Sequence, residues 1–257
     1  EREKYMIIIK TEEQIQKMKK AGELLAEVHK EIAKIIRPGI TTMEIDNFVE
    51  EYLKERGAYP EQKGYQGYPY ATCASINDEI CHGYPREETI KDGDIVTIDM
   101  VVNLDGWLAD SAWSYGVGNI SEEGDKLLKV TKKSLYLGIE QAVIGNRLGD
   151  IGHAIQSYVE SQGFSVVRDF VGHGIGKDMH EDPQVLHYGN PGRGPRLLEG
   201  MVITIEPMIN TGTYKMKVDS NGWTARTIDG GLSAQYEHTI AITKDGPMIL
   251  TDQGEER

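Results

Sequence analysis

Apolar residues recur at a helical period in four parts of the chain. The first stripe begins behind a capping-box pair, Thr11 and Gln14, and keeps a 3-4-3-4 spacing to Ile36, which predicts a long amphipathic helix. His29 lies on this stripe, and we interpret it as a core histidine rather than a ligand. The four patterns together predict helices over residues 11–36, 41–57, 121 to about 144, and 150–162.

Between the second and third helices the pattern changes to short β-branched runs. Ile95–Ile98 (IVTI) predicts a mostly buried strand that ends at Asp99, and a turn at Asp105-Gly106 brings Asp110 back beside it. A buried carboxylate is costly unless a cation or hydrogen bonds compensate it, so two on one hairpin favour a metal. Turn and capping aspartates nevertheless explain such a stretch more often when it is taken alone. Other extended segments are predicted at 73–76, 79–82, 202–206 and 236–242, and residues 58–72, rich in Tyr, Gly and Pro, are predicted to form a loop.

An internal repeat organises the chain. Asp92–Asp99 matches Glu199–Glu206 at a shift of 107, and four earlier residues recur 106 positions later. The repeat predicts two similar α+β halves, about residues 12–110 and 121–242, around a pseudo-two-fold axis. Asp99 maps onto Glu206, so the same buried strand ends in a carboxylate in both halves. The four recurring positions are Gly39, Ile45, Tyr52 and Gly57, which return as Gly145, Ile151, Tyr158 and Gly163.

Composition and charge limit the classes of function. The 257 residues are 39% hydrophobic and 27% charged, which is ordinary for a globular protein with a full core. A net charge of −13 opposes nonspecific binding to nucleic acid, and no apolar run is long enough to span a membrane. Cys73 and Cys81 are too few for a disulfide framework, and we expect a cytoplasmic protein. Residues 1–5 precede Met6 and are interpreted as an appended segment, which leaves residues 6–257 as one domain.

Two further stretches carry residues with metal-ligand chemistry. Gly172–Gly176 (GHGIG) presents a histidine among glycines that allow close backbone approach, and Glu237 begins a predicted strand on the face opposite His238. Cys81-His82 would suit a thiol nucleophile and its base, but neighbouring strand residues point to opposite faces, which disfavours nucleophilic catalysis. Four acids and one imidazole exceed the need of one divalent ion and suit two, of Mn, Fe(II) or Co, with Zn as a further choice.

The ligand candidates resemble, in type and order, those of the methionine aminopeptidases: Asp99, Asp110, His173, Glu206 and Glu237. The strings at 77–85 (NDEICHGYP), 180–188 (HEDPQVLHY), 204–208 (TIEPM) and 233–240 (SAQYEHTI) strengthen the resemblance, which runs from residue 6 to about 250. It implies the family's pita-bread α+β fold, in which helices back an antiparallel sheet. Only 31 residues separate the last two ligands, so the resemblance is to the type I, bacterial-like class.

The resemblance implies a role for each of these residues. Asp99 would bind one metal, and His173 with Glu206 would bind the other. Asp110 and Glu237 would bridge the two ions. Glu206 would also carry a proton from the attacking water to the leaving amine.

Further residues would contact the substrate. His180 would touch the scissile carbonyl, and His82 the amide nitrogen. Two residues depart from a common bacterial pattern: Gln62 stands where a cysteine often lies, and Met179 where a phenylalanine is frequent. The implied methionine pocket consists of Tyr65, Tyr68, Cys73, His82, Phe170 and Trp223, and His180 is a further substrate-binding residue. The resemblance also implies one monovalent cation, Na or K, near Asn77, Glu79 and Ser233.

The implied activity is removal of the initiator methionine from nascent polypeptides that have a free α-amine and a small second residue. Such an enzyme is expected to be a monomer that associates transiently with ribosomes and binds no specific nucleic acid or membrane. Two other interpretations stay open. One is a prolidase or aminopeptidase P relative, which shares the ligands but usually carries a further N-terminal domain. The other is a catalytically dead adaptor, which the complete ligand set and the acidic charge disfavour.

Overall fold

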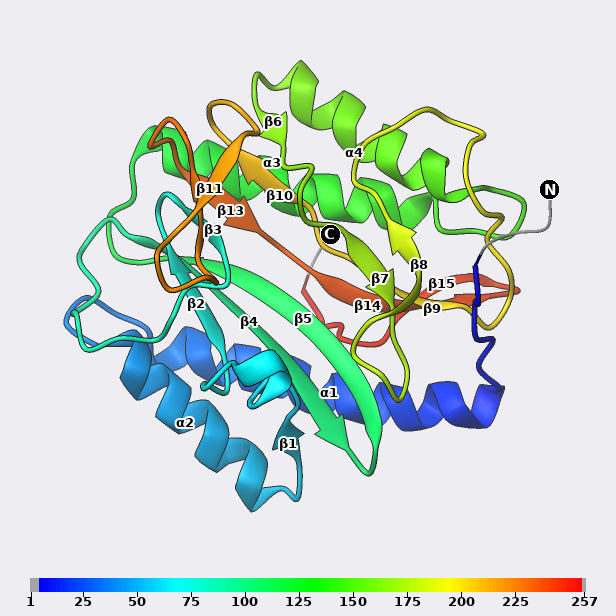
Figure 1. Cartoon of the computed structure of the whole chain (residues 1–257), viewed down its shortest axis with the longest axis horizontal. Helices are drawn as coiled ribbons and strands as arrows, with labels where there is room; N and C mark the ends of the chain where they lie inside the picture. The colour runs from blue at the N-terminus through cyan, green and yellow to red at the C-terminus, as the bar shows by residue number, and fades with distance from the viewer. Residues whose placement is uncertain (1–4, 256–257) are drawn as a thin grey trace.

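The computed structural model describes residues 5–255 as helices packed against antiparallel strands (Figure 1). The predicted helices are confirmed, and capping boxes begin the first two of them. The third ends before the predicted Ile144, because the backbone turns over residues 141–146 and Gly145 adopts a φ of 100°. Residues 1–4 of the segment interpreted as appended lie outside the described residues. The helices are α1 (Glu12–Ile35), α2 (Thr42–Glu55), α3 (Glu122–Glu140) and α4 (Leu148–Ser161), with a short 3-10 helix at Tyr65–Gly67.

The strands of the described chain pair in antiparallel fashion, and the longest two, β4 and β5, form the predicted hairpin. In the first half they are β1 (Tyr59–Pro60), β2 (Cys73–Ile76), β3 (Glu79–Cys81), β4 (Ile95–Leu104) and β5 (Trp107–Gly116). In the second half they are β6 (Ser165–Val166), β7 (Gly172–Gly174), β8 (Glu181–Val185), β9 (Val202–Ile205), β10 (Met208–Asn210), β11 (Met216–Val218), β12 (Ala225–Thr227), β13 (Ser233–Gln235), β14 (His238–Thr243) and β15 (Gly246–Ile249).

Two predicted strand boundaries were wrong. The strand predicted to end at Asp99 continues to Leu104, because every residue of β4 pairs with β5. The strand predicted at 236–242 begins at His238. Pro207 has no N–H to donate, so the strand ladder is interrupted between β9 and β10. The partner strand is interrupted at the same level, between β13 and β14.

The internal repeat reappears in the register of the strands. Both boundaries of α4 lie 106 positions after those of α2. The pairing of β1 with β4 returns as the pairing of β6 with β10, so the halves repeat their hydrogen-bond pattern as well as their sequence. The equivalent pairs are Tyr59 with Asn103 and Ser165 with Asn210, and Pro60 with Val102 and Val166 with Ile209.

The halves meet along a seam between β5 and residues 235–239. At its centre, the Glu237 amide donates to the Ala112 carbonyl at 2.9 Å. On either side of this bond, a side-chain hydroxyl lies between the two backbones. Each hydroxyl accepts a hydrogen bond from the N–H of one residue on the opposite strand and donates one to the C=O of the same residue. Thr239 bonds Asp110 in this way at 3.0 and 2.7 Å, and Ser114 bonds Gln235 at 3.0 and 2.8 Å.

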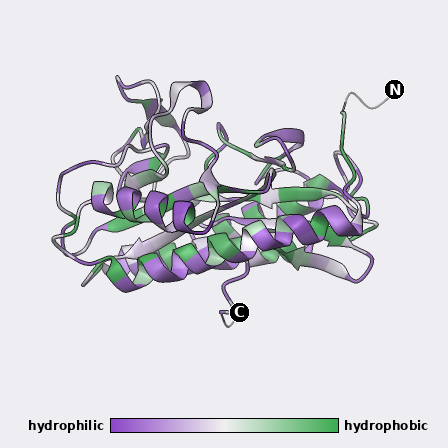
Figure 2. Ribbon diagram, turned by 90° about the horizontal axis from the view of Figure 1, so that it is seen from below, coloured by the Kyte–Doolittle hydropathy of each residue, from purple (hydrophilic) through white to green (hydrophobic). Residues whose placement is uncertain are grey.

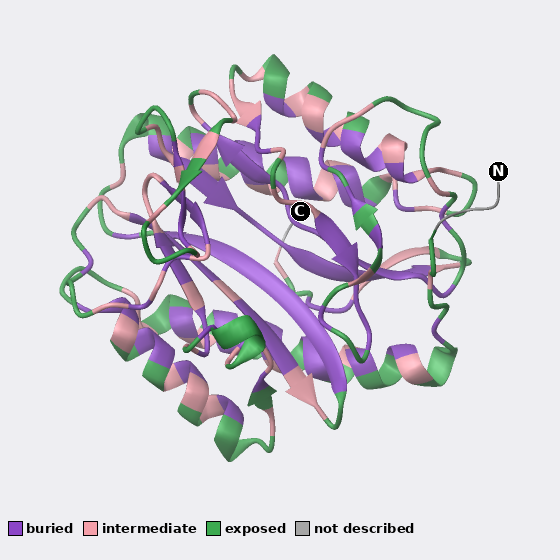
Figure 3. Ribbon diagram, viewed as in Figure 1, coloured by how far each residue is buried: buried purple, intermediate pink, exposed green. Residues whose placement is uncertain are grey.

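The helices cover one side of these strands. α1 packs on β4 and β5, and α3 packs on β13, β10 and β5. Hydrophobic and hydrophilic residues alternate around the helices, and most of β4, β5 and β14 is buried (Figures 2 and 3). No helix in the described part of the chain has the length and apolar character needed to cross a membrane.

His29 is a core residue, as predicted. Its ring is fully buried, with Nδ1 2.8 Å from the Tyr115 hydroxyl and Nε2 3.1 Å from the Ser111 carbonyl. Burial lowers the pKa of His29 to about 4, although the Ser111 carbonyl opposes the shift. The folded protein therefore keeps this imidazole neutral.

We expect His29 to make stability depend on pH. Above pH 6.5 the contribution of His29 to the free energy of unfolding is fully present. It falls as the pH drops toward 4, because His29 binds a proton in the unfolded chain but stays neutral in the folded protein. Between pH 7 and pH 5 the free energy of unfolding should fall by about 2 kcal/mol more in the wild type than in His29→Gln. Urea unfolding at both pH values measures this, and equal losses in the two proteins would contradict it.

The seam should be sensitive to loss of one hydroxyl. Thr239→Val leaves the Asp110 N–H and C=O without their partner, and we expect the free energy of unfolding to fall by about 1–3 kcal/mol. Thr243→Val is the matched control on the same strand, since that half-buried hydroxyl donates to a carbonyl of the β14–β15 turn. It should change stability by less than about 1 kcal/mol. A reversed order of the two variants in denaturant unfolding would refute the role of the seam.

Candidate metal centre

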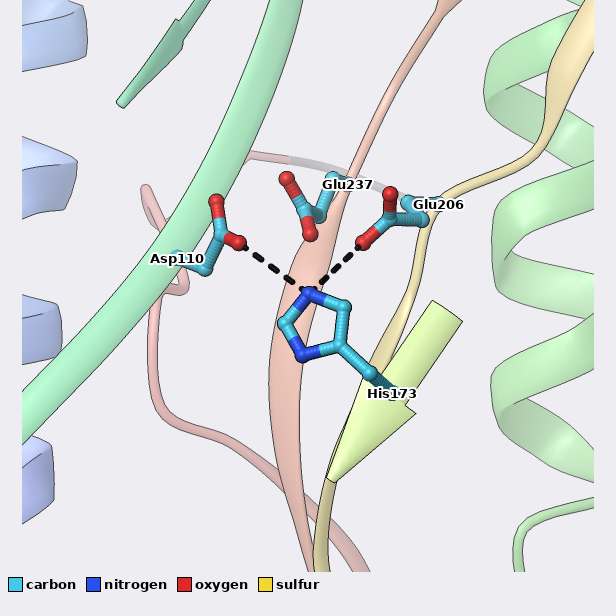
Figure 4. Close-up of side chains that lie close together, drawn as sticks. All are labelled: Asp110, His173, Glu206 and Glu237. Atoms are coloured by element: carbon cyan, nitrogen blue, oxygen red, sulfur yellow. Dashed lines mark ion pairs between the residues drawn. The ribbon is translucent and has the colours of Figure 1, made fainter. Parts of the chain in front are cut away.

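Four predicted ligands converge where the two halves meet (Figure 4). Ligand atoms of Asp110, His173, Glu206 and Glu237 all lie within 4.8 Å of one another, and all four residues are buried. They come from β5, from β7, from the residue after β9 and from the gap between β13 and β14. Chain segments from both halves are therefore needed to assemble the cluster.

The imidazole faces the acids. His173 Nε2 lies 3.4 Å from Asp110 Oδ2 and 3.5 Å from Glu206 Oε2, while Nδ1 is 2.9 Å from the Gly174 carbonyl. The carbonyl can only accept, so Nδ1 carries the proton in the neutral ring and Nε2 is free to bind a cation. Burial alone would lower the pKa of His173, but the two carboxylates raise it to about 9.

The carboxylates repel one another in a buried space. Burial, reinforced by the charge of Asp110, raises the pKa values of Asp99 and Glu237 well above the ordinary range. Burial also raises the pKa of Glu206. At Asp110 burial acts in the same direction, but the neighbouring His173 overrides it and lowers the pKa. Such a group of acids needs positive charge to be fully ionised.

The residues fit a divalent metal centre. Within residues 5–255, Asp99 Oδ1, Asp110 Oδ1 and both carboxylate oxygens of Glu237 are buried and have no hydrogen-bond partner. Buried polar atoms are normally satisfied, so the unpaired oxygens of Asp110 and Glu237 within the cluster indicate a cation. Asp99 is not among the four residues of the cluster, but it lines the cavity beside them. Oxygen-rich ligation with a single nitrogen is the chemistry of Mn, Fe(II) and Co, and Zn also accepts it.

Local geometry holds Glu206 in place. Glu206 follows the last residue of β9, and its amide donates to His187 Nε2 at 3.0 Å instead of to a strand. The Thr204 hydroxyl donates to Glu206 Oε2 at 2.8 Å. A Cβ at Gly172 would lie 2.3 Å from the Thr204 carbonyl oxygen, so only glycine lets β7 bring His173 this close. His187 was not predicted from the sequence, where its only signal is its place in the HEDPQVLHY string.

A cavity of about 520 Å³ opens over the cluster. Aromatic rings pack edge to face on its walls: Tyr68 against Trp223 at 5.2 Å, and His82 against Phe170 at 5.2 Å. The ring centroids of His180 and His173 are 4.5 Å apart. The structure brings all the predicted substrate residues to this cavity: Tyr65, Tyr68, Cys73, His82, Phe170, His180 and Trp223.

Two other cavity residues correct or extend the sequence argument. Cys81 and His82 were expected to point apart, but both line the cavity, because His82 has a φ of 57° and strand alternation stops there. Nucleophilic catalysis stays disfavoured for a different reason: burial raises the pKa of the Cys81 thiol well above its usual value. Gln62 accepts from the Val101 amide at 2.8 Å and donates to the Asp99 carbonyl at 3.2 Å, so it fixes the backbone of a predicted ligand.

Comparison with known proteins identifies the family. Residues 16–244 match the model of metallopeptidase family M24. A methionine aminopeptidase of Clostridium perfringens is 53% identical over 246 residues, which cover 96% of this chain and 99% of the relative. The chain belongs to metallopeptidase family M24, among the methionine aminopeptidases. The resemblance inferred from the ligand series is confirmed, and the chain is a hydrolase.

Solved structures confirm the fold. The crystal structure of methionine aminopeptidase from Rickettsia prowazekii superposes with a TM-score of 0.95 at 45% identity, and the match covers 96% of this chain and 100% of that one. The prolidase from Pyrococcus furiosus matches with a TM-score of 0.78 at 25% identity and is covered over 66% of its length. The pita-bread fold with its pseudo-two-fold repeat is therefore common to both kinds of enzyme.

We expect Asp110→Asn to weaken metal binding and leave the fold intact. The substitution removes a negative oxygen from the cluster, whereas the Asp110 backbone stays bonded to Thr239. The affinity for Mn²⁺, measured by titration calorimetry, should fall by about 100-fold or more. Asp105→Asn is the matched control at the exposed turn of the same hairpin, where asparagine tolerates the φ of 53°. Equal affinities in the two variants would exclude Asp110 as a ligand.

Proposed function

We propose that this chain removes the N-terminal methionine from nascent polypeptides, preferentially when the second residue is small. The observation that carries the proposal is the convergence of the carboxylates and His173 on one buried centre beneath an aromatic cavity. The family membership supports the same reaction. Two divalent ions, of Mn, Fe(II), Co or Zn, are the proposed cofactors.

Each member of the cluster has a proposed role. Asp99 would hold one ion, and His173 with Glu206 the other, while Asp110 and Glu237 would be shared. Bound ions of this kind lower the pKa of water enough to supply hydroxide near neutral pH. Burial raises the pKa of Glu206, which suits a group that accepts a proton from the attacking water and returns it to the leaving amine.

Two histidines would act on the scissile amide. Desolvation lowers the pKa values of His82 and His180. The imidazole of His180 lowers the pKa of His82 further, and the imidazole of His173 does the same to His180. Both rings are therefore neutral hydrogen-bond donors near pH 7. His180, close to His173, would stabilise the charge that develops on the carbonyl oxygen. His82, deeper among the aromatic rings, would contact the amide nitrogen.

The cavity fits a methionine side chain. Aromatic edges and a thiol surround it, and a thioether makes favourable contacts with aromatic ring edges. Burial raises the pKa of the Cys73 thiol well above its usual value, so this wall stays uncharged. The proposed pocket residues are Tyr65, Tyr68, Cys73, His82, Phe170 and Trp223, and His180 is a further proposed substrate contact.

The proposal includes a monovalent cation and the extent of the catalytic domain. A monovalent cation, Na or K, would bind oxygens near Asn77, Glu79 and Ser233, where the Ser233 hydroxyl is buried without a partner among the described residues. Stabilisation of the wild type by K⁺ or Na⁺ that is lost in Ser233→Ala would test this. Residues 6–257 would form one catalytic domain whose halves are about 12–110 and 121–242.

The cellular setting follows from the substrate. A monomer in the cytoplasm that meets nascent chains would associate transiently with ribosomes, without recognising a specific nucleic acid or a membrane. The net charge of −13 disfavours strong nonspecific attachment to RNA. Cosedimentation with ribosomes that carry nascent chains, compared with empty ribosomes, tests the association; equal absence from both pellets would dismiss it.

The function is tested by release of methionine from Met-Gly-Met. We expect release after addition of Mn²⁺, Fe²⁺ or Co²⁺, and none after chelation, because the buried acids need the ions to activate water. N-acetylated Met-Gly-Met is the matched control, since its blocked amine cannot complete the metal coordination. An X-Pro peptide should be cleaved poorly. Preference for X-Pro would favour the prolidase interpretation, and failure with all three metals would reject the proposal.

A further inference from the structure

A buried ion pair ties the segment before α1 to the loop that carries His180. Lys10 Nζ lies 2.5 Å from Glu181 Oε1, and the two side chains are only 3% and 6% exposed. The partners are 171 positions apart, so a tertiary contact and not the local chain brings them together. We call residues 6–10 the brace and residues 176–182 the His180 loop.

Further contacts hold the brace against the loop. The Met6 amide donates to Asp182 Oδ2 at 2.9 Å, and Ile7 forms a parallel bridge with Asp182. Within the loop, Glu181 Oε2 accepts from the Asp178 amide at 3.4 Å. The carboxylate of Glu181 is thus bonded on one side to the brace and on the other to its own loop.

The ion pair packs closely against Gly176. A Cβ at Gly176 would lie 2.6 Å from Glu181 Oε2 and 2.7 Å from Lys10 Cε, so a side chain there would require the ends of both side chains to shift. A buried charge that loses its partner is strongly destabilised, which confines the Glu181 carboxylate to this one position.

His180 stands directly before Glu181 and reaches the cavity. Its Nδ1 is 3.2 Å from the Tyr65 hydroxyl, and its ring packs against that of His173. His180 is exposed to solvent, so the packing around its ring holds the ring only in part. The position of the ring therefore depends more on the position of the backbone at residue 180. The position of that backbone is set by the neighbours that the brace holds, Glu181 and Asp182.

We propose that Lys10 is a positioning residue that holds His180 over the metal centre through Glu181. The inference rests on the proposed function, in which His180 contacts the scissile carbonyl. Lys10 neither belongs to the cluster nor lines the cavity itself. Its side chain reaches the cavity wall only at Glu181, the residue next to His180, so we infer that its effect on the reaction passes through His180. A purely structural Lys10 would instead affect the reaction whether or not His180 is present.

The test is a double-mutant cycle on release of methionine from Met-Gly-Met by the metal-loaded protein. Lys10→Met, which keeps the unbranched stem without the charge, should lower kcat/KM by about tenfold or more, because small misplacements of a positioned group slow the reaction strongly. In the His180→Ala background the same substitution should change kcat/KM by less than about twofold. Lys17→Met is the matched control, since it removes a lysine from an exposed pair with Glu13, and it should behave as the wild type.

A second variant tests the proposal if Lys10→Met folds poorly. Gly176→Ala keeps both charges but forces the ends of the two side chains to shift, and it should show the same dependence on His180. Equal losses in the presence and absence of His180, or no loss in the wild-type background, would overturn the inference. If the wild type releases no methionine, the proposed function fails separately. The imidazole NMR resonances of His180 then decide the positioning: Lys10→Met or Gly176→Ala must shift them, and Lys17→Met must not.

Discussion

Across the seam between β5 and residues 235–239, hydrogen bonds of the Glu237 amide and of several hydroxyls hold the halves of the protein in a single register. That register places Asp110 and Glu237 beside each other although they lie far apart in the chain. Backbone bonds and buried apolar packing oppose the repulsion between the acids, so the cluster is formed by the fold and not by attraction among its members. His173 and Glu206 complete it from the second half.

The electrostatics of the cluster explain why this fold is suited to metals. Burial raises the pKa values of Asp99, Glu206 and Glu237, whereas the His173 imidazole lowers that of Asp110. Without a nearby cation, these buried carboxyl groups keep protons, and a bound divalent ion would displace them. The same arrangement that destabilises the ionised acids therefore strengthens their affinity for cations, and it couples metal binding to pH.

The sequence predicted more of the site than is usual, because the chain contains its own internal comparison. The repeat identified Glu206 as the counterpart of Asp99, and glycines flanking His173 indicated a close approach that the structure confirms. Local rules failed where the backbone leaves regular structure. Pro207 interrupts a ladder that alternation would have continued, and the positive φ of His82 turns it toward the same cavity as its neighbour Cys81.

What the sequence by itself determined is local or periodic: the capping boxes that begin α1 and α2, the apolar stripes, the β4–β5 hairpin and the repeat. These depend on contacts within a few residues or on a period that can be counted along the chain. Only the tertiary structure decided the seam register, the bond from the Glu206 amide to His187, and the burial of Lys10 against Glu181. Each of these joins residues from separate elements, and their distance depends on how the whole chain closes, which no local pattern encodes.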